Sequence, residues 1–172
     1  MHKQRGVSLI EVLVAVLVFS FGLVGLAGLL TLAARSNHSA YLHTQAAFLA
    51  QGMADRMRLN SVAVWRHDYD ADYPIAPGNV TCDASQPCDP AQLASHDKAV
   101  WSGQLKIFLP QASAKLSCKT DDARVDPVAL GMLGKRPPFG GSCTMMLSWD
   151  DRPTPDGSST HTRQTLDWEF QP

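Results

Sequence analysis

The sequence predicts an α+β fold in which one long N-terminal helix packs on a small antiparallel sheet. Three patterns predict it. These are an apolar run at the N-terminus, an apolar stripe at helical spacing that continues it, and two alternating segments near the C-terminus. With 172 residues the chain has room for one domain beyond the helix, because domains commonly span about 100–150 residues. The expected segments are residues 1–6, 7–34, 35–60 and 61–172.

The run from Val7 to Ala34 is long enough to cross a membrane, and its one charged residue is Glu11. A helix over this run would measure about 42 Å, against a hydrocarbon core of about 30 Å. Lys3 and Arg5 precede it, so the positive-inside rule keeps the N-terminus cytoplasmic and sends the following residues across. A secretory signal has a shorter apolar core of about 7–15 residues and a small-x-small junction, and the run matches neither feature.

Glu11 stands out because an acid within a membrane helix is costly. Insertion scales put the cost at about 2.5–3.5 kcal/mol near the centre of the bilayer, which makes such a residue a functional hypothesis by default. A structural alternative exists, because a carboxylate in the first helical turn interacts favourably with the macrodipole by about 0.3–1 kcal/mol. The position of Glu11 alone leaves both readings open.

Residues 6–14 read Gly-Val-Ser-Leu-Ile-Glu-Val-Leu-Val, and this segment resembles the processing motif of type IV prepilins. The resemblance implies that a membrane prepilin peptidase cuts after Gly6 and methylates the new N-terminus at Val7, where the family usually has phenylalanine. It also implies that Glu11 acts in subunit docking. The amine freed at Val7 is largely cationic. It can therefore neutralise the Glu11 carboxylate of a neighbouring subunit and offset the desolvation of both charges.

A second segment narrows the resemblance. Residues 89–97, together with Trp101 and Leu109-Pro110, are similar to a segment of minor pilins of the PilV type. This implies a pilin-like fold and a role in priming filament assembly at the tip. The implied partners are the major pilin, other minor pilins, the inner-membrane assembly platform and a tip adhesin. The implied location is the bacterial inner membrane, with the head in the periplasm, and then the pilus. Two alternatives share the N-terminal motif: a minor pseudopilin of type II secretion and a DNA-uptake minor pilin.

The helix is expected to continue beyond Arg35. Apolar residues recur there at three- and four-residue intervals: Leu42, Ala46, Leu49, Met53 and Met57. The pattern predicts one helix from about Val7 to Asn60 whose second half is amphipathic. Three glycines in the first half each cost about 1 kcal/mol relative to alanine and mark where the helix could unwind on assembly: Gly22, Gly25 and Gly28.

All four cysteines lie beyond the apolar run, in the part expected to be exported. An even count there indicates an oxidising compartment. Three pairings are possible, and we favour one short local loop and one link across the C-terminal region: Cys82–Cys88 and Cys118–Cys143. The spacing lacks the Cys-x-x-Cys pairs of a tetrahedral zinc site.

Residues 65–90 are rich in Asp, Pro, Gly and Asn and are expected to form an irregular loop. Within them Asp68, Asp70 and Asp72 alternate as at the start of a calcium loop. The positions that need the turn glycine and the bidentate glutamate hold tyrosine and asparagine instead. Calcium binding is therefore a hypothesis that stands beside a solvated acidic loop.

A second helix is expected to begin at Asp89, an acidic N-cap followed by proline at the first helical position, and to end before Pro110. Its apolar residues recur at helical spacing: Leu93, Val100, Trp101, Leu105 and Phe108. Two strands are expected near the C-terminus, each with one apolar face: Cys143, Met145, Leu147 and Trp149 in the first, and Leu166, Trp168 and Phe170 in the second.

Charge disfavours nucleic acid as a partner. The chain has fifteen basic and sixteen acidic residues. Cleavage after Gly6 would remove Lys3 and Arg5, leaving thirteen against sixteen and a net charge of −3. Aspartates dilute the basic residues of the exported part: Lys115, Lys119, Arg124, Lys135 and Arg136.

No pattern typical of an enzyme is present, and no cofactor is predicted. Ser142 follows two glycines without the nucleophile-elbow motif. The histidines beyond the leader are scattered, and His96-Asp97 is expected on a solvated helix face.

Overall fold

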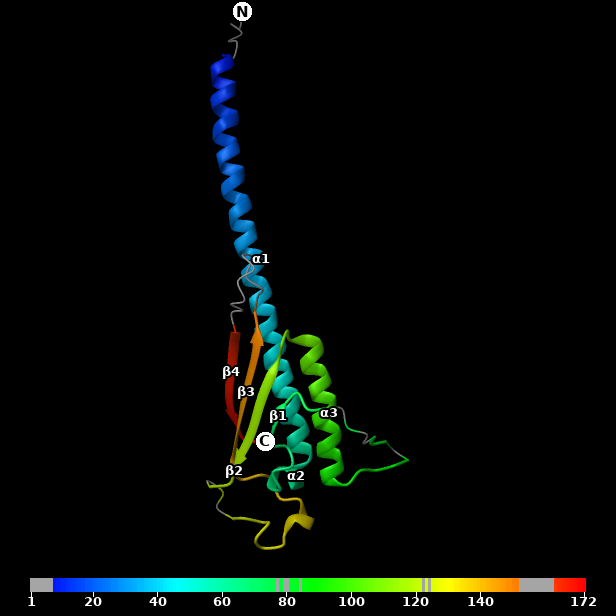
Figure 1. Cartoon of the computed structure of the whole chain (residues 1–172). Helices are drawn as coiled ribbons and strands as arrows, with labels where there is room; N and C mark the ends of the chain where they lie inside the picture. The colour runs from blue at the N-terminus through cyan, green and yellow to red at the C-terminus, as the bar shows by residue number, and fades with distance from the viewer. Residues whose placement is uncertain are drawn as a thin grey trace, which may run out of the picture. The chain divides into compact units, whose positions relative to one another are not determined.

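The computed structural model describes residues 8–76, 78, 81–83, 85–121, 123, 125–151 and 163–172. The fold is α+β, as predicted. Its elements are α1 (Leu9–Leu59), α2 (Ser61–Trp65), β1 (Ala71–Tyr73), α3 (Pro90–Phe108), β2 (Ser113–Lys119), η1 (Leu133–Lys135), β3 (Ser142–Asp150) and β4 (Arg163–Phe170). The chain divides into two compact units, Met1–Tyr41 and Leu42–Pro172, and α1 contributes to both (Figure 1).

In the first unit α1 is exposed on all sides. Its large apolar side chains from Leu9 to Leu32 are between 49% and 82% exposed. The helix is continuous through the three predicted weak points, and a Cβ on any of them would meet no other group within 4 Å: Gly22, Gly25 and Gly28. Unwinding on assembly stays a prediction about the filament.

In the second unit α1 is amphipathic, as predicted. All five residues of the predicted stripe are at most 8% exposed: Leu42, Ala46, Leu49, Met53 and Met57. The hydrogen bond from Asn60 N to Met57 O closes the last turn. The side chains of this stripe form the core together with the inward face of the sheet and α3.

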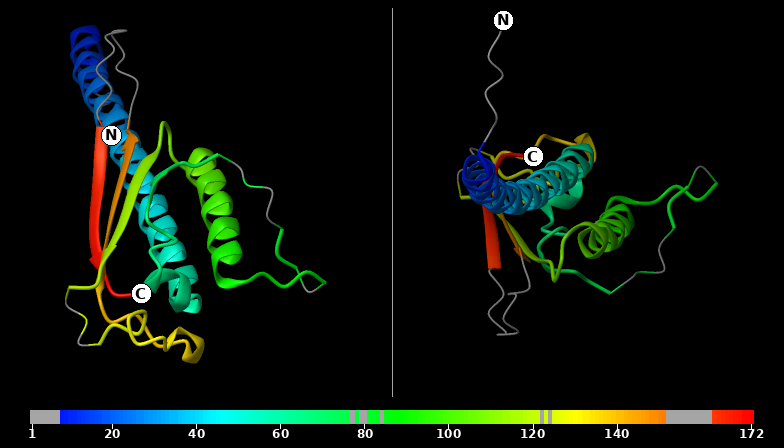
Figure 2. Two further views of the ribbon diagram at one scale, coloured as in Figure 1. Left: turned by 60° about the horizontal axis from the view of Figure 1, so that its bottom comes forward. Right: turned by 90° about the horizontal axis from the view of Figure 1, so that it is seen from above.

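The sheet has four antiparallel strands in the order β1-β2-β3-β4 (Figures 1 and 2). The predicted inward face of β3 is confirmed, because each of its four residues is at most 1% exposed: Cys143, Met145, Leu147 and Trp149. In β4, Leu166 and Trp168 are half-buried and Phe170 is buried, so the predicted face of that strand is confirmed as well.

α3 begins as predicted. Asp89 accepts a hydrogen bond from Gln92 N (2.8 Å) and the Gln92 side chain accepts one from Asp89 N (3.0 Å), which completes a capping box ahead of Pro90. The Trp101 indole donates to Leu49 O of α1 (2.9 Å). Phe108 departs from its predicted place: it is 44% exposed, because the helix ends there and the C-cap Leu109 fills the core instead.

The prediction of an irregular loop over residues 65–90 is wrong at Ala71–Tyr73, which form β1. Pairing with β2 explains the difference, because Asp72 lies opposite Lys115 and Tyr73 opposite Ala114. Cross-strand partners override the low strand propensity of aspartate.

The connection between β2 and β3 is fastened to α2. The Trp65 indole donates hydrogen bonds to the carbonyls of Pro137 and Pro138 (3.3 Å each). Its ring packs edge-on against Phe139, with the ring centroids 4.8 Å apart. Gly141 lies so close to β2 that a Cβ there would overlap the carbonyl oxygen of Lys119. A side chain at Gly140 would make only ordinary contacts, the nearest at 3.5 Å.

We expect Gly141→Ala to lower the free energy of unfolding by about 1–3 kcal/mol, because the new methyl group must push two neighbouring strands apart. Urea unfolding of the full chain in detergent measures the change. Gly140→Ala is the matched control and should change stability by less than about 0.5 kcal/mol. Equal stability of the two variants would contradict the close approach at Gly141.

Candidate assembly and processing site

Glu11 lies in the first turn of α1. The Ser8 carbonyl accepts hydrogen bonds from Glu11 N (3.0 Å) and Val12 N (3.3 Å), so the helix is established at this residue. The Glu11 carboxylate forms no ion pair within the described part of the chain. The two other predicted site residues, Gly6 and Val7, lie outside the described residues.

The helix around Glu11 is apolar on every side. By length and composition it is able to cross a membrane. A surface helix of a globular protein has one apolar face, whereas a helix that is apolar all round is buried in lipid or in other protein. In such surroundings burial of a carboxylate costs free energy that a close cationic partner offsets.

A second polar site lies inside the second unit and was not predicted. Asp97 of α3 is 5% exposed. Its carboxylate accepts hydrogen bonds from Arg56 Nη1 (2.9 Å) and from the Tyr69 hydroxyl (2.8 Å). Asn60 Nδ2 donates to the Tyr69 oxygen (3.1 Å) and to Pro90 O (2.8 Å). The expectation that Asp97 lies on a solvated face is therefore wrong, because Arg56 on the neighbouring helix provides the charge that its burial requires.

Burial also affects the two tyrosines of this region. The pKa of Tyr69 is raised above its ordinary value, mainly by desolvation and further by the charge of Asp97, while the hydrogen bond from Asn60 acts in the opposite direction. Desolvation raises the pKa of Tyr73 in the same way, with a contribution from Asp70. The Tyr73 hydroxyl donates to Tyr69 O (2.7 Å). Both hydroxyls therefore stay protonated in the folded chain well above neutral pH.

The three aspartates of the calcium hypothesis have separate roles. The carboxylate of Asp70 accepts hydrogen bonds from Cys118 N (3.2 Å to each oxygen) and lies 3.1 Å from His67 Nδ1. The side chain of Lys98 donates to the backbone carbonyl of Asp68 (2.6 Å), and Asp72 is exposed in β1. Over the described ranges, no group of three or more His, Cys, Asp or Glu residues is placed to hold a metal ion. The calcium hypothesis thus gains no support.

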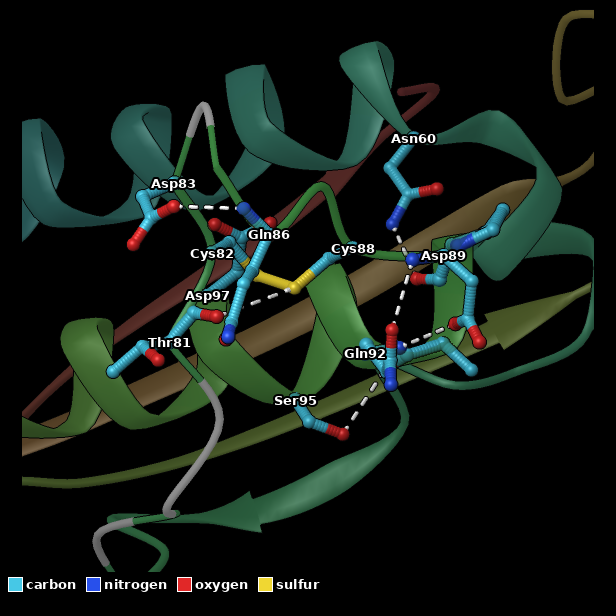
Figure 3. Close-up of a disulfide and its surroundings, with 12 residues drawn as sticks. Asn60, Thr81, Cys82, Asp83, Gln86, Cys88, Asp89, Gln92, Ser95 and Asp97 are labelled. Carbon is cyan, nitrogen blue, oxygen red and sulfur yellow. Dashed lines mark hydrogen bonds between the residues drawn. A yellow bond between two sulfur atoms is a disulfide. The ribbon is translucent and has the colours of Figure 1, made fainter.

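The structure contains both favoured disulfides. Cys82–Cys88 closes a short loop next to the start of α3 (Figure 3). Within this loop the Asp83 carboxylate accepts hydrogen bonds from the Ser85 hydroxyl and from two backbone N–H groups, and these bonds lower its pKa. Cys118–Cys143 joins residues that lie directly opposite each other on β2 and β3.

The remaining candidate residues are not brought together. Lys115 and Lys119 are exposed on β2, Lys135 and Arg136 belong to the η1 turn, and Arg124 lies outside the described residues. Of the histidines, His43 meets the ring of Trp149 edge-on at 4.9 Å. These positions give no support to a nucleic-acid or catalytic site.

The long N-terminal helix and the four-stranded antiparallel sheet form an α+β fold that is consistent with a pilin-like fold. Comparison with known families finds the prokaryotic N-terminal methylation motif at residues 1–27. The chain therefore carries a type IV prepilin-like leader, and the motif supports a protein of the type IV pilin-like or pseudopilin class. No curated protein and no solved structure matches the chain significantly.

The class has direct consequences for processing and location. A prepilin-type motif implies cleavage by prepilin peptidase and handling by a membrane assembly machinery. The apolar helix and the motif together fit membrane anchoring. The comparison gives no positive indication of catalysis.

Alkaline pH should destabilise the second unit. The folded chain holds the protons of Tyr69 and Tyr73 to higher pH than the unfolded chain does, so this stability is fully present below the ordinary pKa and is lost as pH rises above about 10. Each tyrosine should contribute a loss of about 1.4 kcal/mol per pH unit. Urea unfolding from pH 8 to pH 11 measures the slope.

Tyr69→Phe should remove about half of this slope, whereas Tyr41→Phe, at a residue that is 54% exposed, should leave it unchanged. The same slope in both variants would contradict a protonated, buried Tyr69.

Proposed function

We propose that this chain is a minor pilin of the type IV pilus, of the PilV type. It is inserted in the inner membrane with its head in the periplasm, cut after Gly6 and methylated at Val7. It then joins other minor pilins at the tip of the filament and primes assembly of the major pilin. The support comes from one feature above all: Glu11 is the one charged residue of the exposed, apolar part of α1 up to Ala34, and it lies within the methylation motif at residues 1–27.

The proposed role of Glu11 is to set the register between subunits. Leaving either charge alone in apolar surroundings is costly, while a close pair of opposite charges offsets much of that cost. A subunit that docks with the wrong stagger would leave Glu11 without its cationic partner. The carboxylate thus acts mainly by penalising incorrect arrangements, because the apolar side chains around it would tolerate many of them.

The segments expected from the sequence follow from this proposal: a leader over 1–6, a membrane and assembly helix over 7–34, an amphipathic continuation over 35–60 and a head over 61–172. The partners would be prepilin peptidase, the inner-membrane assembly platform, the major pilin, other minor pilins and a tip adhesin.

A minor pseudopilin of type II secretion remains the alternative, because it shares the motif and the class. Recovery of the chain in sheared surface filaments, and normal secretion without it, would favour the pilus.

We expect the mature chain to begin at an N-methylated Val7. Intact-mass and N-terminal peptide analysis of the protein from a cell that contains prepilin peptidase measures this directly. Gly6→Leu should leave the full-length chain uncut, because the peptidase needs the small residue. Purified wild-type protein that begins at an unmodified Met1 would contradict the proposal.

We expect Glu11→Leu to insert in the inner membrane at the normal level but to enter filaments at least about tenfold less than the wild type, because its docking partner is lost. Immunoblots of membrane and sheared-filament fractions measure both quantities. Ser20→Leu is the matched control in the same apolar helix and should enter filaments normally. Normal incorporation of Glu11→Leu would remove the docking role.

A further inference from the structure

The sheet ends in an open edge at β4. This strand pairs with β3 along its whole length, from Arg163 opposite Asp150 to Phe170 opposite Cys143. Within the ranges that the structure describes, no strand pairs with its other side. Figure 2 shows β4 at the margin of the sheet. An edge of eight residues presents a row of backbone N–H and C=O groups that can pair with another chain.

An apolar groove of about 340 Å³ runs beside this edge, between α1 and β4. Its lining residues are Ala47, Ala50 and Gln51 of α1 with Leu166, Asp167 and Trp168 of β4. Phe48, next to the groove-lining Ala47, is 69% exposed. A strand added to β4 would lie about 4.8 Å further out. Its inward side chains would then meet Ala47, Ala50 and Trp168.

The outward face of β4 is acidic near its end. Asp167 and Glu169 are exposed and form no ion pair within the described part of the chain. Their cross-strand neighbours on β3 are the uncharged Met146 and Thr144. Arg163, at the start of the strand, is already bonded to Asp150 (3.2 Å) and to Ser113. The edge therefore presents two negative charges that have no ion-pair partner among the described residues, next to the apolar surface of the groove.

We propose that the β4 edge is a docking site for an extended segment of a partner protein in which apolar and basic residues alternate. The segment would add a fifth strand to the sheet, with its apolar side chains in the α1–β4 groove and its basic side chains opposite Asp167 and Glu169. Backbone hydrogen bonds to β4 would supply affinity. The apolar and the basic side chains of the segment would supply specificity. A second copy in parallel alignment is disfavoured, because it would set these acids against the same acids.

The probe is a seven-residue peptide of alternating lysine and valine, with a fluorophore on its N-terminus, an amidated C-terminus and a ¹³C-labelled carbonyl, added to the full chain in nonionic detergent at low salt. We expect saturable binding by fluorescence anisotropy, no binding to empty micelles, and an infrared shift of the labelled carbonyl to the β-sheet position. A peptide with the same residues in two blocks, and one N-methylated at alternate residues, should each bind at least about tenfold more weakly.

The double substitution Asp167→Lys and Glu169→Lys should weaken binding of the alternating peptide about tenfold. Asp72→Lys with Asp121→Lys is the matched control, because it changes the net charge equally at exposed acids away from β4, and it should leave binding within about twofold. The proposal is overturned if the control weakens binding as much, if the block or N-methylated peptide binds as well as the alternating one, or if the labelled carbonyl shows no β-sheet signal.

Discussion

The helix α1 contributes to both compact units, and its apolar side chains are distributed differently in each. The rest of the structure depends on this distribution. Up to Leu32 they cover every side of α1, and from Leu42 onward most of them form one buried stripe, with Phe48 and Leu59 exposed outside it. Because only one stripe of α1 has to be covered in the second unit, a single sheet and one further helix are enough to bury it. The boundary between the two compact units, after Tyr41, coincides with this change of pattern.

Polar groups in the second unit show how closely its parts must fit. Asp97 lies inside the core only because Arg56 and the Tyr69 hydroxyl meet both of its oxygens. Removing either partner would leave a poorly solvated charge, a far larger penalty than loss of an exposed ion pair. The same logic, applied between chains instead of within one, underlies the proposed role of Glu11. In that proposal the Glu11 carboxylate, like that of Asp97, favours one arrangement because an unpaired buried charge is costly.

Patterns that repeat along one element could be predicted from the sequence. The α1 stripe, the α3 cap at Asp89 and the inward face of β3 follow from periods of 3.6 and 2 and from capping chemistry. What could not be predicted depends on residues distant in sequence. Asp97 is buried because of Arg56, 41 positions earlier, and β1 is a strand because β2 lies beside it. Neither has a local signal, and the His96-Asp97 pair by itself suggests a surface position.

The core of the second unit is rich in thioethers, and this gives it an uneven sensitivity to oxidants. Met53, Met57 and Met145 are wholly enclosed, whereas Met146 is 46% and Met132 36% exposed. Conversion to the sulfoxide makes a side chain polar, and reagents reach it far more readily at the surface. Peroxide should therefore oxidise Met132 and Met146 while the second unit stays folded. Oxidation of Met53, Met57 or Met145 would require the core to open, so its rate reports how often the second unit unfolds.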